Sequence, residues 1–142
     1  LMAVFGLGNI AGPTAGVECM RRIVESYPAI REAVRAESLG DLRLSVGVAA
    51  GEVVMGMLGT EKRSELAIIG NPANLSSRLQ EFTKVAIQSA EGKNTLGEFT
   101  AAMGVCQPEL SEGMKGFKTV TLPSSIRIRD FENIEELTVI TA

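Results

Sequence analysis

Asn74 and Arg78, four residues apart, are the pair of side chains in this sequence best suited to chemistry. An apolar run ends before them at a glycine, and an Asn-Pro step follows. This pattern predicts that a strand ends and a helix begins, with Asn71 as the N-cap and Pro72 at the first helical position. On that helix an amide, a permanent cation and the positive end of the dipole would face the same way, which suits a phosphate-like anion. Taken alone, the same spacing is more typical of a capped surface helix with a solvated arginine.

The elements that must position this pair alternate between helices and strands. Apolar residues recur at helical spacing over 13–37, where Pro28 predicts a kink or a break into two helices. The helix that carries the pair should bury Leu75, Leu79 and Phe82 and end near residue 85. Strands are expected at 1–5 (buried), 42–48, 52–58, 66–69, 118–122, 126–128 and 137–141, with 99–105 either a strand or a helical turn. Hairpins mixed with crossover helices predict a single α+β domain over residues 1–142.

Composition excludes several classes of protein. The chain of 142 residues contains no histidine, which removes His-based triads and His-ligated zinc. Its net charge of −3 argues against nucleic acid as a partner. Cys19 and Cys106 have no metal-type spacing, and a reduced, cytoplasmic chain is the simplest expectation. No apolar run approaches a membrane span, so we expect no direct membrane contact from this segment, although it could be the cytosolic domain of a larger, membrane-attached protein.

Several ordered blocks of the sequence resemble the class III nucleotidyl cyclase catalytic domain, the adenylate/guanylate cyclase family. The segment 45–56 resembles the glycine-punctuated strand pair of that family, 59–63 its Gly-x-Glu-Lys-Arg turn, and 69–79 its strand-to-helix signature. Residues 1–6 resemble the strand that follows its second metal-binding position. The likeness is close over about half of the chain and looser after residue 90.

The resemblance implies a fold, partners and a reaction. The fold would be a ferredoxin-like βαββαβ domain, an antiparallel-rich sheet with helices on one face, here N-terminally incomplete. Two domains would pair head to tail as a homodimer, with active sites at the interface. The 3′-hydroxyl of ATP or GTP would attack its own α-phosphate, giving the cyclic nucleotide and pyrophosphate. Two Mg²⁺ or Mn²⁺ ions would assist, as in other two-metal displacements, and their aspartate ligands would lie upstream of Leu1, so that this segment alone holds no metal ligand.

The resemblance also assigns roles to individual residues. Asn74 would orient the ribose, and Arg78 would stabilise charge on the transferred phosphoryl group. Ile68 would approach the base through its backbone. Arg129 stands roughly where the family has a lysine that contacts the terminal phosphates. Asn71, at the N-terminal end of the same helix, replaces a common aspartate.

One departure from the family pattern keeps other functions open. Ala67 stands where the family often has Asp or Thr to recognise the base, and an alanine side chain cannot hydrogen-bond a purine. The first alternative is a non-catalytic cyclase-like module that binds nucleotide or pairs with a catalytic partner. The second is a structural ferredoxin-like interaction domain. Asp41 and Asp130 could be proposed as metal ligands, but local pairing or solvation is the expected role of both.

Overall fold

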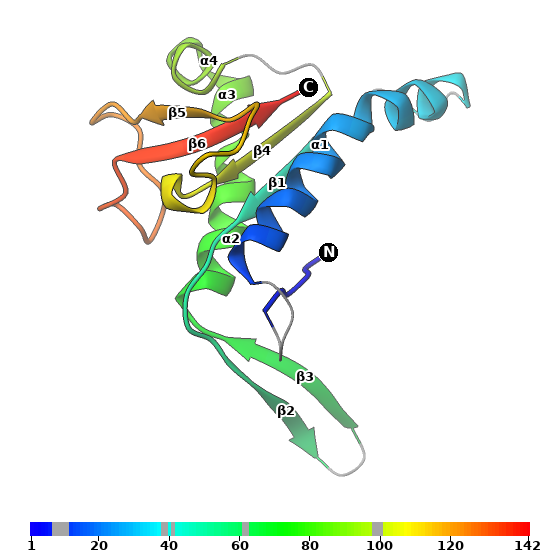
Figure 1. Ribbon diagram of the computed structural model, residues 1–142, viewed down its shortest axis with the longest axis vertical. Helices are drawn as coiled ribbons and strands as arrows, with labels where there is room; N and C mark the ends of the chain where they lie inside the picture. The colour runs from blue at the N-terminus through cyan, green and yellow to red at the C-terminus, as the bar shows by residue number, and fades with distance from the viewer. Residues whose placement is uncertain (7–11, 38–39, 41, 61–62, 98–100) are drawn as a thin grey trace.

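A computed structural model of the chain describes residues 1–6, 12–37, 40, 42–60, 63–97 and 101–142 (Figure 1). Asp41 therefore lies outside the described residues. The helices and strands are, in order, α1 (Pro13–Ala36), β1 (Leu44–Val48), β2 (Val54–Thr60), β3 (Arg63–Ile69), α2 (Asn71–Phe82), α3 (Val85–Gln88), α4 (Ala90–Leu96), β4 (Ala102–Cys106), the 3₁₀ turn η1 (Pro108–Leu110), β5 (Lys118–Thr121) and β6 (Glu136–Thr141).

The main sheet has four strands in the order β1-β4-β6-β5. β1 runs parallel to β4, while β6 is antiparallel to both β4 and β5. β2 and β3 form a separate antiparallel hairpin that extends away from the body of the molecule (Figure 1). The α+β class and the antiparallel-rich sheet predicted from the sequence are confirmed.

Helices cover both faces of the main sheet. Successive strand residues point to opposite faces, and β4 is buried along its whole length. Ala102 and Cys106 of β4 pack in one apolar cluster with α1, whereas Met103 and Val105 pack in a second cluster with α2 and α4. The expectation of helices on one face only is therefore wrong. An apolar strand without polar alternation is the signature of a sheet covered on both sides.

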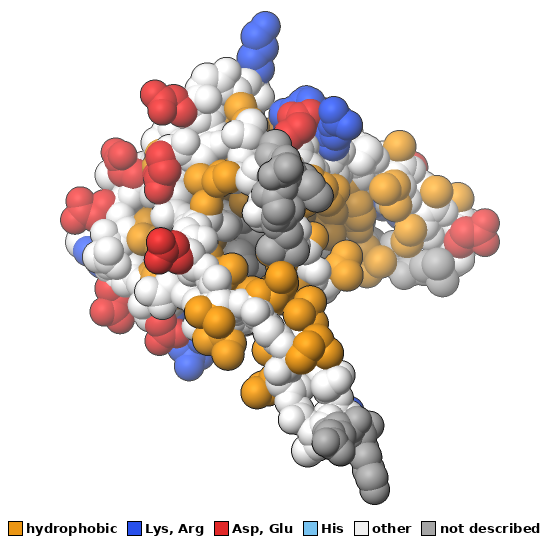
Figure 2. Space-filling model, turned by 60° about the horizontal axis from the view of Figure 1, so that its bottom comes forward, with side chains coloured by type: hydrophobic (Ala, Val, Ile, Leu, Met, Phe, Trp, Pro, Cys, Tyr) orange, Lys and Arg blue, Asp and Glu red, His pale blue; other side chains and the backbone are white. Residues whose placement is uncertain are grey.

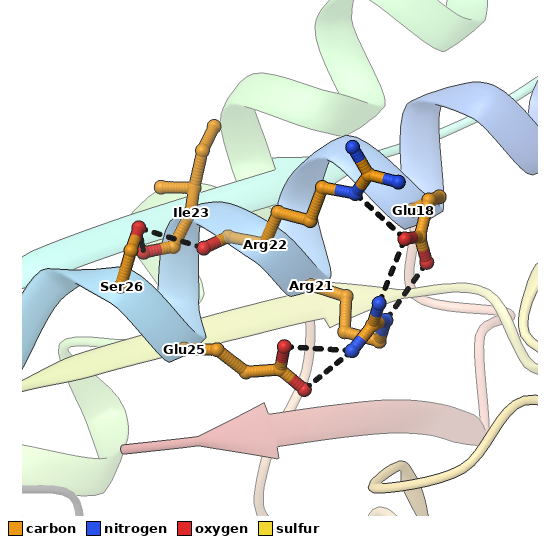
Figure 3. A network of polar contacts seen from close by, with 6 residues as sticks. All are labelled: Glu18, Arg21, Arg22, Ile23, Glu25 and Ser26. Carbon is orange, nitrogen blue, oxygen red and sulfur yellow. Dashed lines mark hydrogen bonds and ion pairs between the residues drawn. The ribbon is translucent and has the colours of Figure 1, made fainter.

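α1 is one continuous helix that passes through Pro28. A proline removes one backbone hydrogen bond and can bend a helix without ending it. The solvent side of α1 carries a network of charged side chains (Figure 3). Glu18 accepts hydrogen bonds from Arg21 at 2.7 Å and from Arg22 at 2.8 Å, and Arg21 also bonds Glu25 at 2.6 Å. The two arginines lower the pKa of Glu18 from 4.5 to about 2.

Two strands predicted from the sequence are absent. Residues 1–6 form no strand, and the side chains of Met2 and Phe5 are exposed. A strand needs a neighbour to pair with, and among the described strands β1 pairs with β4 alone. Residues 126–128 are also irregular: Ile126 and Ile128 pack in the core, but no described strand pairs with this segment.

The β2–β3 hairpin exposes apolar side chains to solvent. All seven residues of β2 are exposed, including Met57 at 66% and Leu58 at 66%. Leu66 and Ile69 of β3 are exposed as well. Figure 2 shows apolar side chains gathered over the hairpin and at its junction with the body, while most acidic side chains in this view lie at the left of the body. An apolar surface of this kind is typical of an interaction site.

Candidate functional site

The helix that carries Asn74 and Arg78 begins one residue earlier than the sequence predicted. Asn71 is already helical, and the N-cap is Gly70, which offers no side-chain hydrogen bond. Gly70 has φ 156°, and a Cβ there would lie 2.8 Å from the carbonyl oxygen of Glu52. The cap position therefore requires glycine, because the chain approaches the loop before β2 closely and with an unusual backbone conformation. The N-cap role predicted for Asn71 is wrong.

Buried leucine and phenylalanine side chains fix α2 against the main sheet. Leu75, Leu79 and Phe82 are all buried, as predicted. Gly47 of β1 lets the helix approach the strand closely, since a Cβ at that position would overlap the carbonyl oxygen of Ser76 and lie 2.6 Å from the backbone nitrogen of residue 80. The position of α2, and of every side chain on it, is therefore set by direct backbone contact with β1.

Asn74 and Arg78 lie one helical turn apart on α2, as the spacing predicted. Asn74 is exposed, and the side chain of Arg78 is 25% exposed. The guanidinium of Arg78 faces two carboxylates. Its Nε and Nη2 donate to Asp130 Oδ2 at 3.1 and 2.9 Å, and its Nη1 donates to Glu81 Oε2 at 3.0 Å. The hydrogen bond to Glu81 raises the pKa of Arg78 most, and the bonds to Asp130 raise it further. Arg78 is therefore a cation in the folded protein.

The remaining predicted site residues lie around the two ends of α2. Ala67 and Ile68 are half-buried on β3, directly before the helix, and pair with Gly56 and Met55 of β2. Arg129 is exposed on the connection between β5 and β6, where its Nε lies 3.8 Å from Asp130 Oδ2. Asp130 thus lies beside both predicted phosphate-binding arginines, Arg78 and Arg129.

Sequence reasoning identified Arg78 but not its partner from a distant part of the chain. Asp130 was expected to pair locally with Arg129 or to be solvated, and it does lie beside Arg129. Its hydrogen bonds, however, go to Arg78, 52 residues earlier in the chain. No spacing rule connects residues so far apart. An aspartate directly after Arg129, a predicted phosphate-binding arginine, was nevertheless a local signal that a carboxylate would compete with phosphate at this site.

Within the described residues, no group of three or more Cys, Asp and Glu side chains is arranged to hold a metal ion. The arginines at this site attract anions rather than cations, so the residues present do not form a centre for divalent ions. Two open hollows, of about 680 and 540 Å³, lie elsewhere on the surface, and neither is lined by Asn74 or Arg78. The candidate site on a single chain is an open surface on α2. In the described part of the chain, every helix is too short or too polar to cross a bilayer.

The fold is cyclase-like. It is similar to the crystal structure of the guanylyl cyclase Cya2, with a TM-score of 0.57 and 18% sequence identity, over 95% of this chain and 60% of that one. At this identity the likeness shows the fold alone. No family model matches the chain.

The sequence has relatives in mycobacteria. It is 41% identical over 85 residues to uncharacterized protein Rv1320c of Mycobacterium tuberculosis, and 37% identical over 49 residues to uncharacterized protein Rv1319c of the same organism. These matches cover 58% and 34% of this chain but 14% and 9% of the relatives. The chain thus spans a small part of the length of the relatives it matches, and their names assign no activity.

Proposed function

We propose that this chain is the C-terminal part of a class III nucleotidyl cyclase catalytic domain, which converts ATP or GTP to the 3′,5′-cyclic nucleotide and pyrophosphate. The observation that carries the proposal is the placement of Asn74 and Arg78 one turn apart on α2, within a fold that is similar to a guanylyl cyclase over 95% of the chain. The sequence blocks around α2 support the same assignment.

In this proposal each site residue acts on a different part of the substrate. Asn74 hydrogen-bonds the ribose and so orients its 3′-hydroxyl toward the α-phosphorus. Arg78 stabilises the negative charge that grows on the phosphoryl oxygens, because its planar guanidinium stays charged and can contact two oxygens at once. Arg129 contacts the terminal phosphates. The unpaired backbone N–H groups at the start of α2, near Asn71, favour an anion nearby.

The base would lie near the end of β3. The backbone of Ile68 offers it hydrogen bonds, and Ala67 provides an apolar contact without a hydrogen bond of its own. The proposal therefore leaves the choice between adenine and guanine to other residues. Divalent ions, Mg²⁺ or Mn²⁺, would be bound by the aspartates that the family resemblance places upstream of Leu1.

A head-to-tail homodimer would complete the site. The support for this partner is the β2–β3 hairpin, whose exposed Val54, Met57 and Leu58 have no cover in a single chain. Apolar residues on a projecting arm gain stability when a second copy removes them from water. Because the hairpin leads directly into α2, such a contact would also bring the partner close to the proposed substrate site.

A non-catalytic cyclase-like module is the second candidate. The observation that favours it is that the donors of Arg78 are engaged by Asp130 and Glu81 rather than left open to a ligand. Such a module would bind nucleotide, or pair with a catalytic partner, without turnover.

Cyclic nucleotide production by the complete gene product tests the proposal. The protein is incubated with ATP or GTP and Mg²⁺ or Mn²⁺, and both cyclic products are measured. Arg78→Ala and Asn74→Ala should lower kcat by about a hundredfold or more, the usual effect of losing a transition-state donor. Arg22→Ala, a matched loss of an exposed arginine on α1, should leave the activity unchanged. A folded dimer that makes no cyclic nucleotide but binds triphosphate would favour the module instead.

A further inference from the structure

We propose that Asp130 competes with the triphosphate for binding to Arg78. Its carboxylate occupies the anion-binding edge of Arg78 until the phosphate groups of the ligand displace it. This inference rests on the proposed function, because it assumes that Arg78 binds phosphate. It adds a residue that sets the affinity of that site for anions.

The carboxylate of Asp130 lies where a phosphate oxygen would lie. One oxygen, Oδ2, accepts two hydrogen bonds from Arg78, at 2.9 and 3.1 Å, and lies 3.8 Å from Nε of Arg129. The two arginines come from distant segments, α2 and the β5–β6 connection. An anion held between converging guanidinium groups is the arrangement expected of a phosphate site.

Asp130 uses the part of Arg78 that a phosphate group would need. A guanidinium binds carboxylates and phosphates through two neighbouring N–H groups. Asp130 engages one such edge, formed by Nε and Nη2, while Glu81 accepts from Nη1 on the other side. A phosphate group can make a two-point contact with the Nε–Nη2 edge of Arg78 only after Asp130 moves away.

The position of Asp130 is fixed by the chain around it. It occupies the third position of a turn in which the N–H of Phe131 donates to the carbonyl oxygen of Ile128 at 3.0 Å. Ile128 is 1% exposed, and Phe131 packs against the same apolar cluster. Asp130 has φ 67°, and in the described part of the chain it is the sole residue other than glycine with a positive φ. Aspartate tolerates this conformation better than most residues, but a positive φ still costs conformational free energy.

Arg78 is held just as firmly on its side. Its helix is anchored by Leu75 and Leu79, which lie in the same apolar cluster as Ile128. The shared core therefore sets the separation between the backbones of α2 and the turn.

The contact lowers the affinity of any ligand that must displace Asp130, so tight binding requires a highly charged ligand. Asp130 is 58% exposed, so water or a ligand can reach it and it can turn away. A triphosphate offers several charged oxygens and gains more from the two arginines than a single carboxylate does. A ligand with one phosphate gains less and should compete poorly.

Binding of non-cyclisable ligands to the complete protein tests this inference. Calorimetry would use inorganic tripolyphosphate, inorganic phosphate, and the 3′-deoxy forms of ATP and GTP with Mg²⁺. Asp130→Asn keeps the shape and tolerates positive φ, and Asp130→Gly relieves the backbone; both remove the charge. Each should bind tripolyphosphate about twofold to fivefold more tightly than the unaltered protein, the range of one ion pair. Affinity for inorganic phosphate should rise as well.

Two control variants distinguish loss of the Asp130 charge from loss of a negative charge elsewhere nearby. Glu132→Gln removes an exposed carboxylate two residues away and should change affinity little. Glu81→Gln should have a smaller effect than Asp130→Asn, because Glu81 accepts through one nitrogen of Arg78. Thermal unfolding of each variant checks that the fold is kept.

The outcomes distinguish this inference from the proposed function. Tighter binding in both Asp130 variants, lost again when Arg78→Ala is added, supports it. Unchanged or weaker binding in Asp130→Asn, with Arg78→Ala still abolishing binding, overturns the competitor role and leaves the cyclase proposal standing. Failure of the unaltered protein and of both variants to bind any of the triphosphate ligands overturns the inference and the proposed function together.

Discussion

Gly47→Ala tests whether close contact between β1 and α2 positions the site. A Cβ at residue 47 would overlap the carbonyl oxygen of Ser76, lie 2.6 Å from the backbone nitrogen of Gln80 and lie 3.1 Å from Cβ of Leu79. Two of these three atoms belong to the backbone, and a methyl group has no rotamer that avoids them. The helix must therefore move away from the strand.

The size of the effect follows from the overlap. Forcing one carbon into a packed backbone contact costs about 1–3 kcal/mol, and we expect the upper end because the neighbours cannot rotate away. A chain of this length has an unfolding entropy that converts such a loss into a fall in Tm of roughly 7–10 °C. Displacing α2 by about 1 Å should also lower the proposed cyclase activity of the complete protein by about a hundredfold, since catalysis depends on positioning.

Circular dichroism during thermal unfolding gives the change in Tm, and the cyclase assay gives the activity. Gly56→Ala is the matched control, because a Cβ at Gly56 on β2 has no neighbour within 4 Å. A Tm for Gly47→Ala within a degree or two of the unaltered protein would refute the close approach and the argument for how α2 is placed.

Three further predictions concern a surface carboxylate, a buried thiol and the hairpin. The arginines lower the pKa of Glu18 from 4.5 to about 2, so the stability that this carboxylate contributes is complete above pH 4.5 and is lost as the pH falls toward 2. In Glu18→Gln, the free energy of unfolding should therefore fall less steeply over that pH range. Burial raises the pKa of Cys106 to about 11, so iodoacetamide at pH 8 should modify it in the unfolded protein only, as mass spectrometry would show. Met57→Lys, at a side chain 66% exposed on the hairpin, should weaken self-association in analytical ultracentrifugation; an unchanged dimer would place the interface elsewhere.

The sequence predicted those features that are encoded locally. The apolar face of α2, Leu75, Leu79 and Phe82, follows from helical spacing alone, and the structure buries all three. The strand at 42–48 was equally clear from alternation, and β1 occupies most of that range. The start of α2 was missed by one residue because Gly70 caps through a close backbone approach, whereas the Asn-Pro pattern predicts a side-chain cap.

The features that the sequence did not predict depend on contacts between distant parts of the chain. Residues 1–5 have the composition of a buried strand, but composition cannot supply the neighbour that a strand needs. The two-sided burial of β4 depends on α1 and α2 lying on opposite faces, which no local pattern reveals. The pairing of Arg78 with Asp130 spans 52 residues, so it too required the fold.

The hairpin has a consequence for local folding. β2 and β3 pair with each other and with no other described strand, and a two-stranded ribbon with exposed faces is marginally stable in water. Its backbone amides should therefore exchange with deuterium far sooner than those of β4. If a second copy covers the arm, exchange there should slow as protein concentration rises, so that ordering of the arm and assembly become one coupled equilibrium.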